Sequence, residues 1–328
     1  TTATATGSLA ALVSVGADEP ASFSLLSDFG CLPALLSKGE AVLYSLTGNT
    51  LTAFVDLGAP GGAYEAGTDR PVFTLALSGD NLATWTFTLL DQLDHVTLND
   101  LPGDNTENTG LQLGGGGTVA SIDFSKIIQA TDFDGDSITL DKGSIAVTVI
   151  DDIPVAKSAP TAVTGMVEED GMSLSTGDLS EGNKAPSGDS NADDETSGVA
   201  GTLTALFSAG ADEPLSMSLS STTSGLPTLW SKGEAVLYSV NGAGDTLTAY
   251  VETVGPAGLN AGDRVVFTLT VNGDGSWAFD LRDQLDHVAG GGENTALRTA
   301  ANGSTSVSSI DFSSILVATD FDGDAVTG

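Results

Sequence analysis

Val72-Phe73-Thr74-Leu75-Ala76-Leu77 alternates large apolar side chains with small or polar ones, and Thr84-Trp85-Thr86-Phe87-Thr88-Leu89 repeats the alternation. Successive side chains of a strand point to opposite faces of a sheet, so a period of two indicates strands with one buried face. No segment of comparable length has the 3.6-residue period of an amphipathic helix. The stretch therefore predicts an all-β fold.

The same pair of strands returns in the second half of the chain, at 267–271 and 277–281. Asn272-Gly273-Asp274-Gly275 lies between them and is typical of a hairpin turn. Further strands are predicted at 8–15, 21–26, 40–46, 50–57, 119–129, 137–140 and 144–150. Many short strands separated by turns rich in Gly and Asp favour an antiparallel β-sandwich.

Longer motifs show that the chain contains two copies of one unit. The motif at 16–20 recurs at 210–214, that at 37–44 recurs at 231–238, and that at 91–96 recurs at 283–288. A repeat of this size is a whole domain, because solenoid repeats are only about 20 to 50 residues long.

We therefore predict two tandem domains joined end to end, at 1–154 and 155–328. The boundary follows Val147 to Pro154, where a proline ends further ladder pairing. The polar stretch from 167 to 198 is either a long acidic loop or an irregular first strand of the second domain, and we favour the strand.

The chain is strongly acidic, with 10 Lys and Arg against 44 Asp and Glu and a formal net charge of −34. This charge excludes nucleic acid and anionic membrane surfaces as partners, since both require a basic face. A hydrophobic content of 40% predicts that the chain folds. Cys31 is the one cysteine, so no intramolecular disulfide forms, and no apolar run approaches the roughly 18 residues of a membrane helix.

Asp132-Phe133-Asp134-Gly135-Asp136 recurs as Asp320-Phe321-Asp322-Gly323-Asp324. Carboxylates at every second position of a turn supply hard oxygen ligands, which suit calcium. Calcium takes about six to eight oxygens, so carbonyls, water or other residues must complete each site. The alternative is a solvated turn whose aspartates favour Asx geometry. An EF-hand is excluded because the twelfth-position glutamate and the flanking helices are missing. We predict the calcium ligands Asp132, Asp134, Asp136, Asp320, Asp322 and Asp324.

Two further acidic groups lie on either side of the predicted boundary. Adjacent Asp151 and Asp152 would repel each other unless a cation neutralised them, so we predict that they bind metal. Glu168, Glu169 and Asp170 are weaker candidates, because an acidic run is more often simply solvated. We hypothesise that these residues and the loop at 132–136 form one calcium cluster that stiffens the junction between the domains.

Other polar residues have simpler explanations. Asp94-His95 and Asp286-His287 could be catalytic pairs, but no nucleophile recurs beside them, so a structural hydrogen bond is favoured. Asp212 and Glu213 precede a proline, which favours a turn or bulge. The residues at 191–195 are consistent with either a surface calcium site or a flexible loop.

The ordered set of motifs adds a resemblance to a known family. The set comprises Glu168-Glu169-Asp170-Gly171, the stretch from Asp178 to Asn183, Gly-Ala-Asp-Glu-Pro, Leu-Asp-His, Asp-Phe-Asp-Gly-Asp and the closing Val-Ile-Asp-Asp-Ile-Pro. Together they resemble the tandem Ig-like or cadherin-like repeats of giant RTX adhesins exported by type I secretion. The resemblance covers nearly the whole chain. It implies extender repeats that hold an adhesive tip away from a Gram-negative cell and are stiffened by calcium.

From this resemblance we expect a structural extender that is not an enzyme, lies outside the cell at its surface, binds Ca²⁺ and is monomeric. The ends of the two copies are out of phase, which predicts neighbouring repeats of the same polypeptide as partners. The alternative is a calcium-dependent module that binds carbohydrate or peptide. The near-identity of the two copies favours the extender, because a ligand site would make one copy different.

Overall fold

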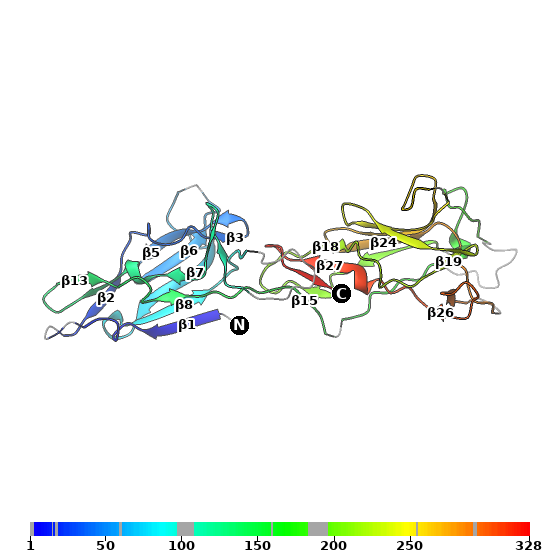
Figure 1. The fold of residues 1–328 in the computed structure, drawn as a ribbon. Coiled ribbons are helices and arrows are strands. Elements are labelled where there is room, and N and C mark those ends of the chain that lie inside the picture. The colour runs from blue at the N-terminus through cyan, green and yellow to red at the C-terminus, as the bar shows by residue number, and fades with distance from the viewer. Residues whose placement is uncertain are drawn as a thin grey trace. The chain divides into compact units, whose positions relative to one another are not determined.

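A computed structural model gives the fold (Figure 1) and describes residues 3–14, 16, 19–58, 61–96, 108–158, 160–182, 196–253, 255–290 and 294–328. Strand accounts for 39% of the structure and helix for 4%, which confirms the all-β class. The described residues form two compact units that meet in sequence between Asp152 and Ile153. We call them unit 1 and unit 2.

Unit 1 contains an antiparallel five-stranded sheet in the order β1-β8-β7-β6-β5. Its strands are β1 (Ala3–Ser8), β5 (Leu43–Thr47), β6 (Thr50–Val55), β7 (Arg70–Ser78) and β8 (Thr84–Leu89). The alternation seen in the sequence decides which face is buried, since Phe73, Leu75 and Leu77 all belong to the core. The predicted strands at 72–77 and 84–89 thus lie within β7 and β8.

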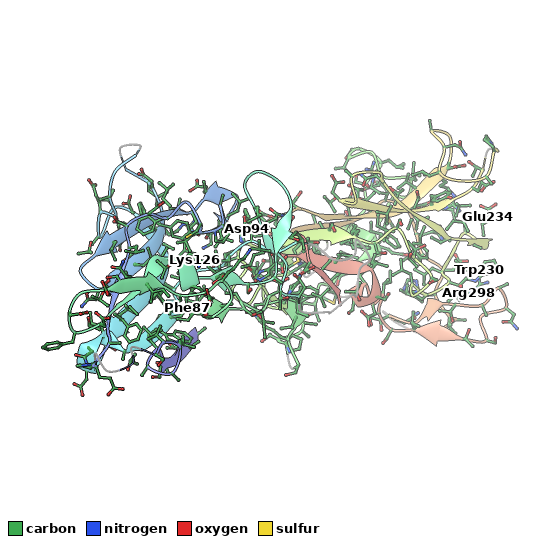
Figure 2. All side chains as sticks on the ribbon, turned by 60° about the vertical axis from the view of Figure 1, so that its left-hand side comes forward. Phe87, Asp94, Lys126, Trp230, Glu234 and Arg298 are labelled. Carbon is green, nitrogen blue, oxygen red and sulfur yellow. The ribbon has the colours of Figure 1, made fainter. Side chains whose placement is uncertain are left out.

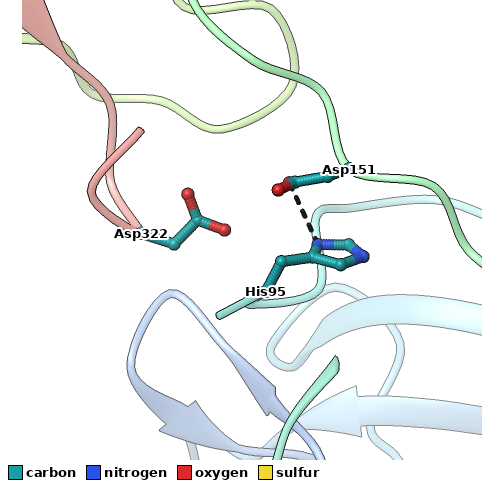
Figure 3. A group of neighbouring side chains, drawn as sticks. All are labelled: His95, Asp151 and Asp322. Carbon is teal, nitrogen blue, oxygen red and sulfur yellow. Dashed lines mark ion pairs between the residues drawn. The ribbon is translucent and has the colours of Figure 1, made fainter. Parts of the chain in front are cut away.

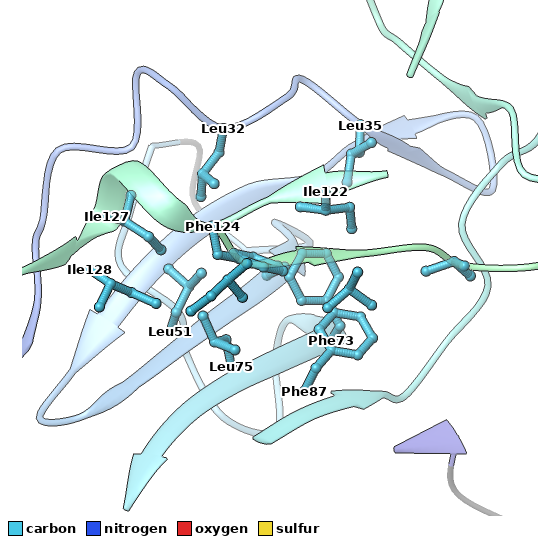
Figure 4. Close-up of a cluster of buried hydrophobic side chains, with 14 of the residues drawn as sticks. Leu32, Leu35, Leu51, Phe73, Leu75, Phe87, Ile122, Phe124, Ile127 and Ile128 are labelled. Carbon is cyan, nitrogen blue, oxygen red and sulfur yellow. The ribbon is translucent and has the colours of Figure 1, made fainter. Parts of the chain in front are cut away.

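A three-stranded sheet in the order β13-β12-β2 supplies the second layer of unit 1. It comprises β2 (Ser22–Leu25), β12 (Ile128–Thr131) and β13 (Ser137–Thr139). Phe23, Ile128 and Ala130 of this sheet share one hydrophobic core with Leu51 and Phe73 of the large sheet. Figure 4 shows this cluster, which gives unit 1 a sandwich-like architecture. Short two-stranded ladders complete the unit: β3 (Leu36–Ser37) with β4 (Glu40–Ala41), β9 (Leu111–Gln112) with β10 (Thr118–Val119), and β11 (Ile122–Asp123) with β14 (Ala146–Val147).

Unit 2 repeats this arrangement. Its five-stranded sheet has the order β16-β24-β23-β22-β21, and its three-stranded sheet has the order β18-β27-β28. These strands are β16 (Gly198–Thr202), β18 (Ser216–Leu219), β21 (Leu237–Val240), β22 (Thr246–Val251), β23 (Arg264–Val271), β24 (Ser276–Leu281), β27 (Leu316–Thr319) and β28 (Ala325–Thr327). The shorter pairs are β15 (Val155–Ala156) with β17 (Phe207–Ser208), β19 (Trp230–Ser231) with β20 (Glu234–Ala235), and β25 (Leu297–Arg298) with β26 (Ser306–Val307).

One glycine in each unit lets a tryptophan lie across the edge strand. Gly7 of β1 is opposite Trp85, and a Cβ at Gly7 would lie 2.7 Å from the indole Nε1. Gly201 of β16 is opposite Trp277, where the same distance is 2.9 Å. A side chain at either glycine would collide with the indole, so the glycine is what allows the tryptophan to cover the edge strand.

The structure corrects two predicted strands. The strand expected at 8–15 lies instead at Ala3–Ser8, because β1 pairs with β8 and the chain then turns, with Leu12 N–H donating to the Leu9 carbonyl. The strand expected at 119–129 is interrupted by a 3₁₀ turn, η2 (Ser125–Ile127). The turn forms because the Asp123 carboxylate accepts hydrogen bonds from both the N–H and the hydroxyl of Ser125.

The polar stretch at 167–198 contains no strand in its first described part, residues 167–182. These residues form turns and a short 3₁₀ turn, η3 (Glu169–Gly171). Met172 directly follows η3 and packs in the core of unit 2. Residues 183–195 lie outside the described part of the chain. Among the described residues, no helix has both the length and the hydropathy needed to cross a bilayer.

Candidate metal centres

The first aspartate loop joins β12 to β13 and is held by its own backbone. Asp132 N–H donates to the Asp136 carbonyl at 3.0 Å, and Asp132 Oδ1 accepts from the N–H groups of Gly135 and Asp136 at 3.0 and 2.8 Å. Gly135 has a φ of 102°, which an L side chain rarely adopts. The Asx geometry considered as an alternative is therefore present in this loop.

The same turn brings three carboxylates together. Asp132, Asp134 and Asp136 each offer an oxygen, and these oxygens lie within 4.8 Å of one another. Only Asp132 Oδ1 is used by the turn, so its other oxygen and the two remaining carboxylates can face a cation. Three oxygens are fewer than the six to eight that calcium takes, and the exposed loop leaves room for water to supply the others.

The second aspartate loop joins β27 to β28 and has the same hydrogen bonds, but its aspartates are less exposed to solvent. Asp320 Oδ1 accepts from Gly323 and Asp324 N–H at 3.2 and 2.9 Å, and Gly323 has a φ of 108°. Oxygens of Asp320, Asp322 and Asp324 again lie within 4.8 Å of one another. Asp320 is only 5% exposed and Asp324 only 9%.

Burial changes the electrostatics of the second loop. Burial, followed by the neighbouring carboxylate of Asp322, raises the pKa of Asp320 to about 8. Asp320 Oδ2 is buried, and no described residue donates a hydrogen bond to it. A divalent cation at this position would offset the repulsion and favour the ionised form. The donor set therefore fits a hard cation such as calcium.

Asp212 lies beside the second loop, which the sequence did not predict. The motif at 210–214 by itself predicts only a turn or bulge, and its Glu213–Pro214 peptide is cis. Phe321 N–H donates to the Asp212 carbonyl at 3.1 Å, and Asp212 is buried. The repetition of both motifs was a signal that they belong together, although it gave no contact. The corresponding Asp18 of unit 1 lies outside the described residues.

Asp151 has protein partners within unit 1. His95 Nδ1 lies 3.1 Å from Asp151 Oδ1 (Figure 3), and Asn108 Nδ2 donates to Asp151 Oδ2 at 2.7 Å. The ring of His95 also contacts the Val149 carbonyl through Nε2 at 3.3 Å. These contacts tie the last residues of unit 1 to its body. A metal-binding role for Asp151 and Asp152 stays a prediction.

Asp94 does not pair with His95 as a catalytic dyad would require. Its carboxylate instead accepts N–H groups of Lys38 and Gly39 at 2.6 and 2.8 Å and so caps the turn between β3 and β4. Burial raises the pKa of Asp94, although these two donors oppose the rise. Figure 2 labels this residue. These contacts are consistent with a structural role for Asp94.

The structure does not bring the loop at 132–136 together with Asp151. The loop adjoins β13, which lies at the opposite end of unit 1 from β3 (Figure 1). Asp151 contacts His95, whose neighbour Asp94 donates its N–H to the Leu36 carbonyl of β3. The predicted single cluster therefore does not include this loop.

Glu169 is also used inside its own unit. Its Oε1 accepts Leu285 N–H at 2.6 Å, and burial raises its pKa despite this bond. Among the described residues, no group of three convergent metal ligands includes Asp152, Glu168, Glu169 or Asp170. The residues at 191–195 lie outside the described part of the chain.

A cationic cluster that the sequence did not predict fixes the same corner of each unit. In unit 1, Arg70 donates to Ser37 Oγ at 2.8 Å and to Asp91, while Lys38 Nζ lies 3.1 Å from Asp91. In unit 2, Arg264 and Lys232 surround Asp283 in the same way. Each of these residues recurs at the matching position of the repeat, which is the one signal that could have revealed the cluster.

Comparison with known proteins gives no relatives: no family model, curated protein or solved structure matches this chain. The geometry of each unit and the resemblance of the motifs are the observations that bear on function.

Proposed function

We propose that this chain is a non-catalytic extender segment of a bacterial surface adhesin, built from two tandem Ig-like or cadherin-like β-sandwich domains stabilised by calcium. The parent family is that of giant RTX adhesins exported by type I secretion, and the chain's partners are neighbouring repeats of the same polypeptide. The proposed location is the outer surface of a Gram-negative cell.

One observation supports this proposal above the others. The same five-residue loop occurs on the same hairpin of both units, and in each it places three carboxylates within reach of one cation. A catalytic or ligand-binding site would have no need to occur twice with the same residues. A repeated stabilising ion is what an extender requires.

The net charge of −34 gives the ion a physical role. Repulsion among carboxylates opposes compaction, and bound divalent cations reduce it. Extracellular calcium modules bind at about 10⁻⁴ to 10⁻³ M, so the sites fill outside the cell and stay empty in a calcium-poor cytosol. We therefore propose that the chain is secreted unfolded and folds after export.

Thermal unfolding followed by circular dichroism tests the proposal. At a hundredfold excess over Kd, each bound calcium stabilises by about 2.7 kcal/mol, which corresponds to about 5 to 10 °C in Tm for a domain of this size. We expect calcium to raise Tm by this amount, and magnesium to do so much less, because it demands a stricter geometry and sheds water reluctantly. An identical Tm in calcium and in EDTA would contradict the proposal.

The predicted stiffening of the junction by calcium stays a prediction. Small-angle scattering with and without calcium checks it. We expect a longer maximum dimension when calcium is present, and superimposable curves would exclude a calcium-dependent joint.

A further inference from the structure

An added strand covers one edge of unit 2. β15 pairs antiparallel with β17, so that Val155 is opposite Ser208 and Ala156 is opposite Phe207. Lys157 N–H then donates to the Leu206 carbonyl at 2.9 Å, and Lys157 Nζ donates to the Thr204 carbonyl. The residues of β15 come from the segment that precedes the repeated motifs of unit 2.

Among the described residues of unit 1, no strand pairs with the matching edge. When the copies are aligned on Gly16 and Gly210, the counterpart of β17 is Val13–Ser14 and that of Leu206 is Leu12. Val13 and Ser14 belong to no strand. Within the described part of unit 1, no hydrogen bond involves their backbone groups or the Leu12 carbonyl. These groups can therefore accept a strand.

Apolar side chains are exposed at the same positions of unit 1. Leu12 is 41% exposed, whereas its counterpart Leu206 packs against the core of unit 2. Ile138 of β13 is 63% exposed, whereas its counterpart Val326 of β28 is only 6% exposed. β15 runs beside β28 in unit 2 (Figure 1). The open edge of unit 1 thus combines unpaired backbone groups with uncovered apolar surface.

We propose that Leu12–Ser14 and Ile138 form an acceptor edge that binds an extended segment of the type Ile153-Pro154-Val155-Ala156-Lys157, supplied by a neighbouring repeat. This inference rests on the proposed extender function for the source of the segment. The sequence contains this segment once, at 153–157, where unit 2 already uses it. Unit 2 therefore supplies both the identity of the occupant and its register.

The chemistry of recognition follows from that register. The incoming Lys157 N–H donates to the Leu12 carbonyl, and the backbone beside Val155 and Ala156 pairs with Ser14 and Val13. Such strand addition derives its affinity from main-chain hydrogen bonds and its specificity from alternate side chains. The segment's single cation also suits a chain with a net charge of −34.

A fluorescently labelled synthetic peptide of residues 153–163 tests the proposal against the full chain by anisotropy. We expect saturable binding of one peptide per chain, because the site of unit 2 is filled by its own segment. Leu12→Asp in the chain should weaken binding at least tenfold. Leu57→Asp is the matched control, since Leu57 is an exposed leucine of unit 1 after β6.

A second variant places the change in the peptide, so that folding of the chain is not affected. Lys157→Pro removes the N–H that donates to the Leu12 carbonyl and should weaken binding at least tenfold. No saturable binding, or equal affinities for the original and proline peptides, would overturn the proposal. Binding without any effect of calcium on Tm would leave the acceptor edge standing and reject the calcium-stabilised extender. A calcium effect on Tm without peptide binding would do the reverse.

Discussion

The two aspartate loops have the same sequence and the same internal hydrogen bonds but different surroundings. In unit 1 the loop at 132–136 is largely exposed, whereas in unit 2 Asp320 and Asp324 are buried. The pKa of Asp320 rises to about 8 through burial and the neighbouring carboxylates. Local sequence therefore decides the shape of the loop, and tertiary packing decides how strongly it needs a cation.

The first test establishes that the two units are otherwise equivalent, and it has the largest expected effect. Phe73 and Phe267 are fully buried, and each packs on two further phenylalanine rings. Phe73→Ala and Phe267→Ala should each cost about 3 to 5 kcal/mol of unfolding free energy. Urea denaturation in saturating calcium measures both. Costs that differ by more than about 1 kcal/mol would mean that the cores are not equivalent, and the loops could no longer be compared by themselves.

The second test separates the loops. Asp320→Asn removes a buried carboxyl whose raised pKa lowers the stability of the fold at neutral pH. We therefore expect a higher Tm in EDTA and a smaller gain on adding calcium, by up to about 2.7 kcal/mol. Asp132→Asn should reduce the calcium gain but leave Tm in EDTA nearly unchanged, because its loop is exposed. Thermal scans of both variants with and without calcium make the measurement.

Asp141→Asn is a control for the loss of one negative charge, since Asp141 lies after β13 and outside the loop. It should change neither the Tm in EDTA nor the calcium gain appreciably. If Asp320→Asn and Asp132→Asn have equal effects in EDTA, the difference in burial has no energetic consequence.

The sequence correctly predicted those features that depend on neighbouring residues alone. Alternation around Phe73 and Phe87 predicted β7 and β8, and the spacing of Asp132, Asp134 and Asp136 predicted that their carboxylates converge. Both depend on the period of a strand or the shape of a turn, which neighbouring residues determine.

The sequence did not predict contacts between segments that are far apart along the chain. Asp212 reaches the second loop through a backbone hydrogen bond to Phe321, and no local pattern reveals that contact. The strand β1 is held by pairing with β8, although its own small side chains give weak strand signals. The Asp123 side chain diverts an otherwise strand-like run into η2. In each case a tertiary contact or a side-chain hydrogen bond overrides the local preference.

The third test concerns a contact of unit 2 that has no counterpart among the described residues of unit 1. Ser180 Oγ donates to Asp283 Oδ1 at 2.5 Å, and the Asp283 side chain is fully buried, whereas Asp91 of unit 1 is partly exposed. Ser180→Ala should cost about 1.5 kcal/mol, because a bond to a buried charged group is lost. Urea denaturation measures it, with exposed Ser175→Ala as a control expected to cost less than about 0.5 kcal/mol. Equal losses would show that the serine does not stabilise Asp283.

The smallest expected effect comes from a pair of residues that differs between the units. The guanidinium of Arg298 lies 5.9 Å from the ring centroid of Trp230 (Figure 2), where unit 1 has Gln112 and Leu36. Arg298 also forms an ion pair with Asp286 at 3.4 Å, so a single substitution mixes two contributions.

A double-mutant cycle separates them. Arg298→Gln, Trp230→Leu and the double variant convert this corner of unit 2 into the residues of unit 1. The coupling free energy from urea denaturation should be about 0.5 to 1 kcal/mol, as expected of a partly exposed cation–π pair. The ion pair with Asp286 is lost in both backgrounds of the cycle and therefore cancels from the coupling. A coupling of zero would mean that the cation–π contact adds nothing to the stability of unit 2, and that the ion pair with Asp286 and apolar packing account for the effect of both substitutions.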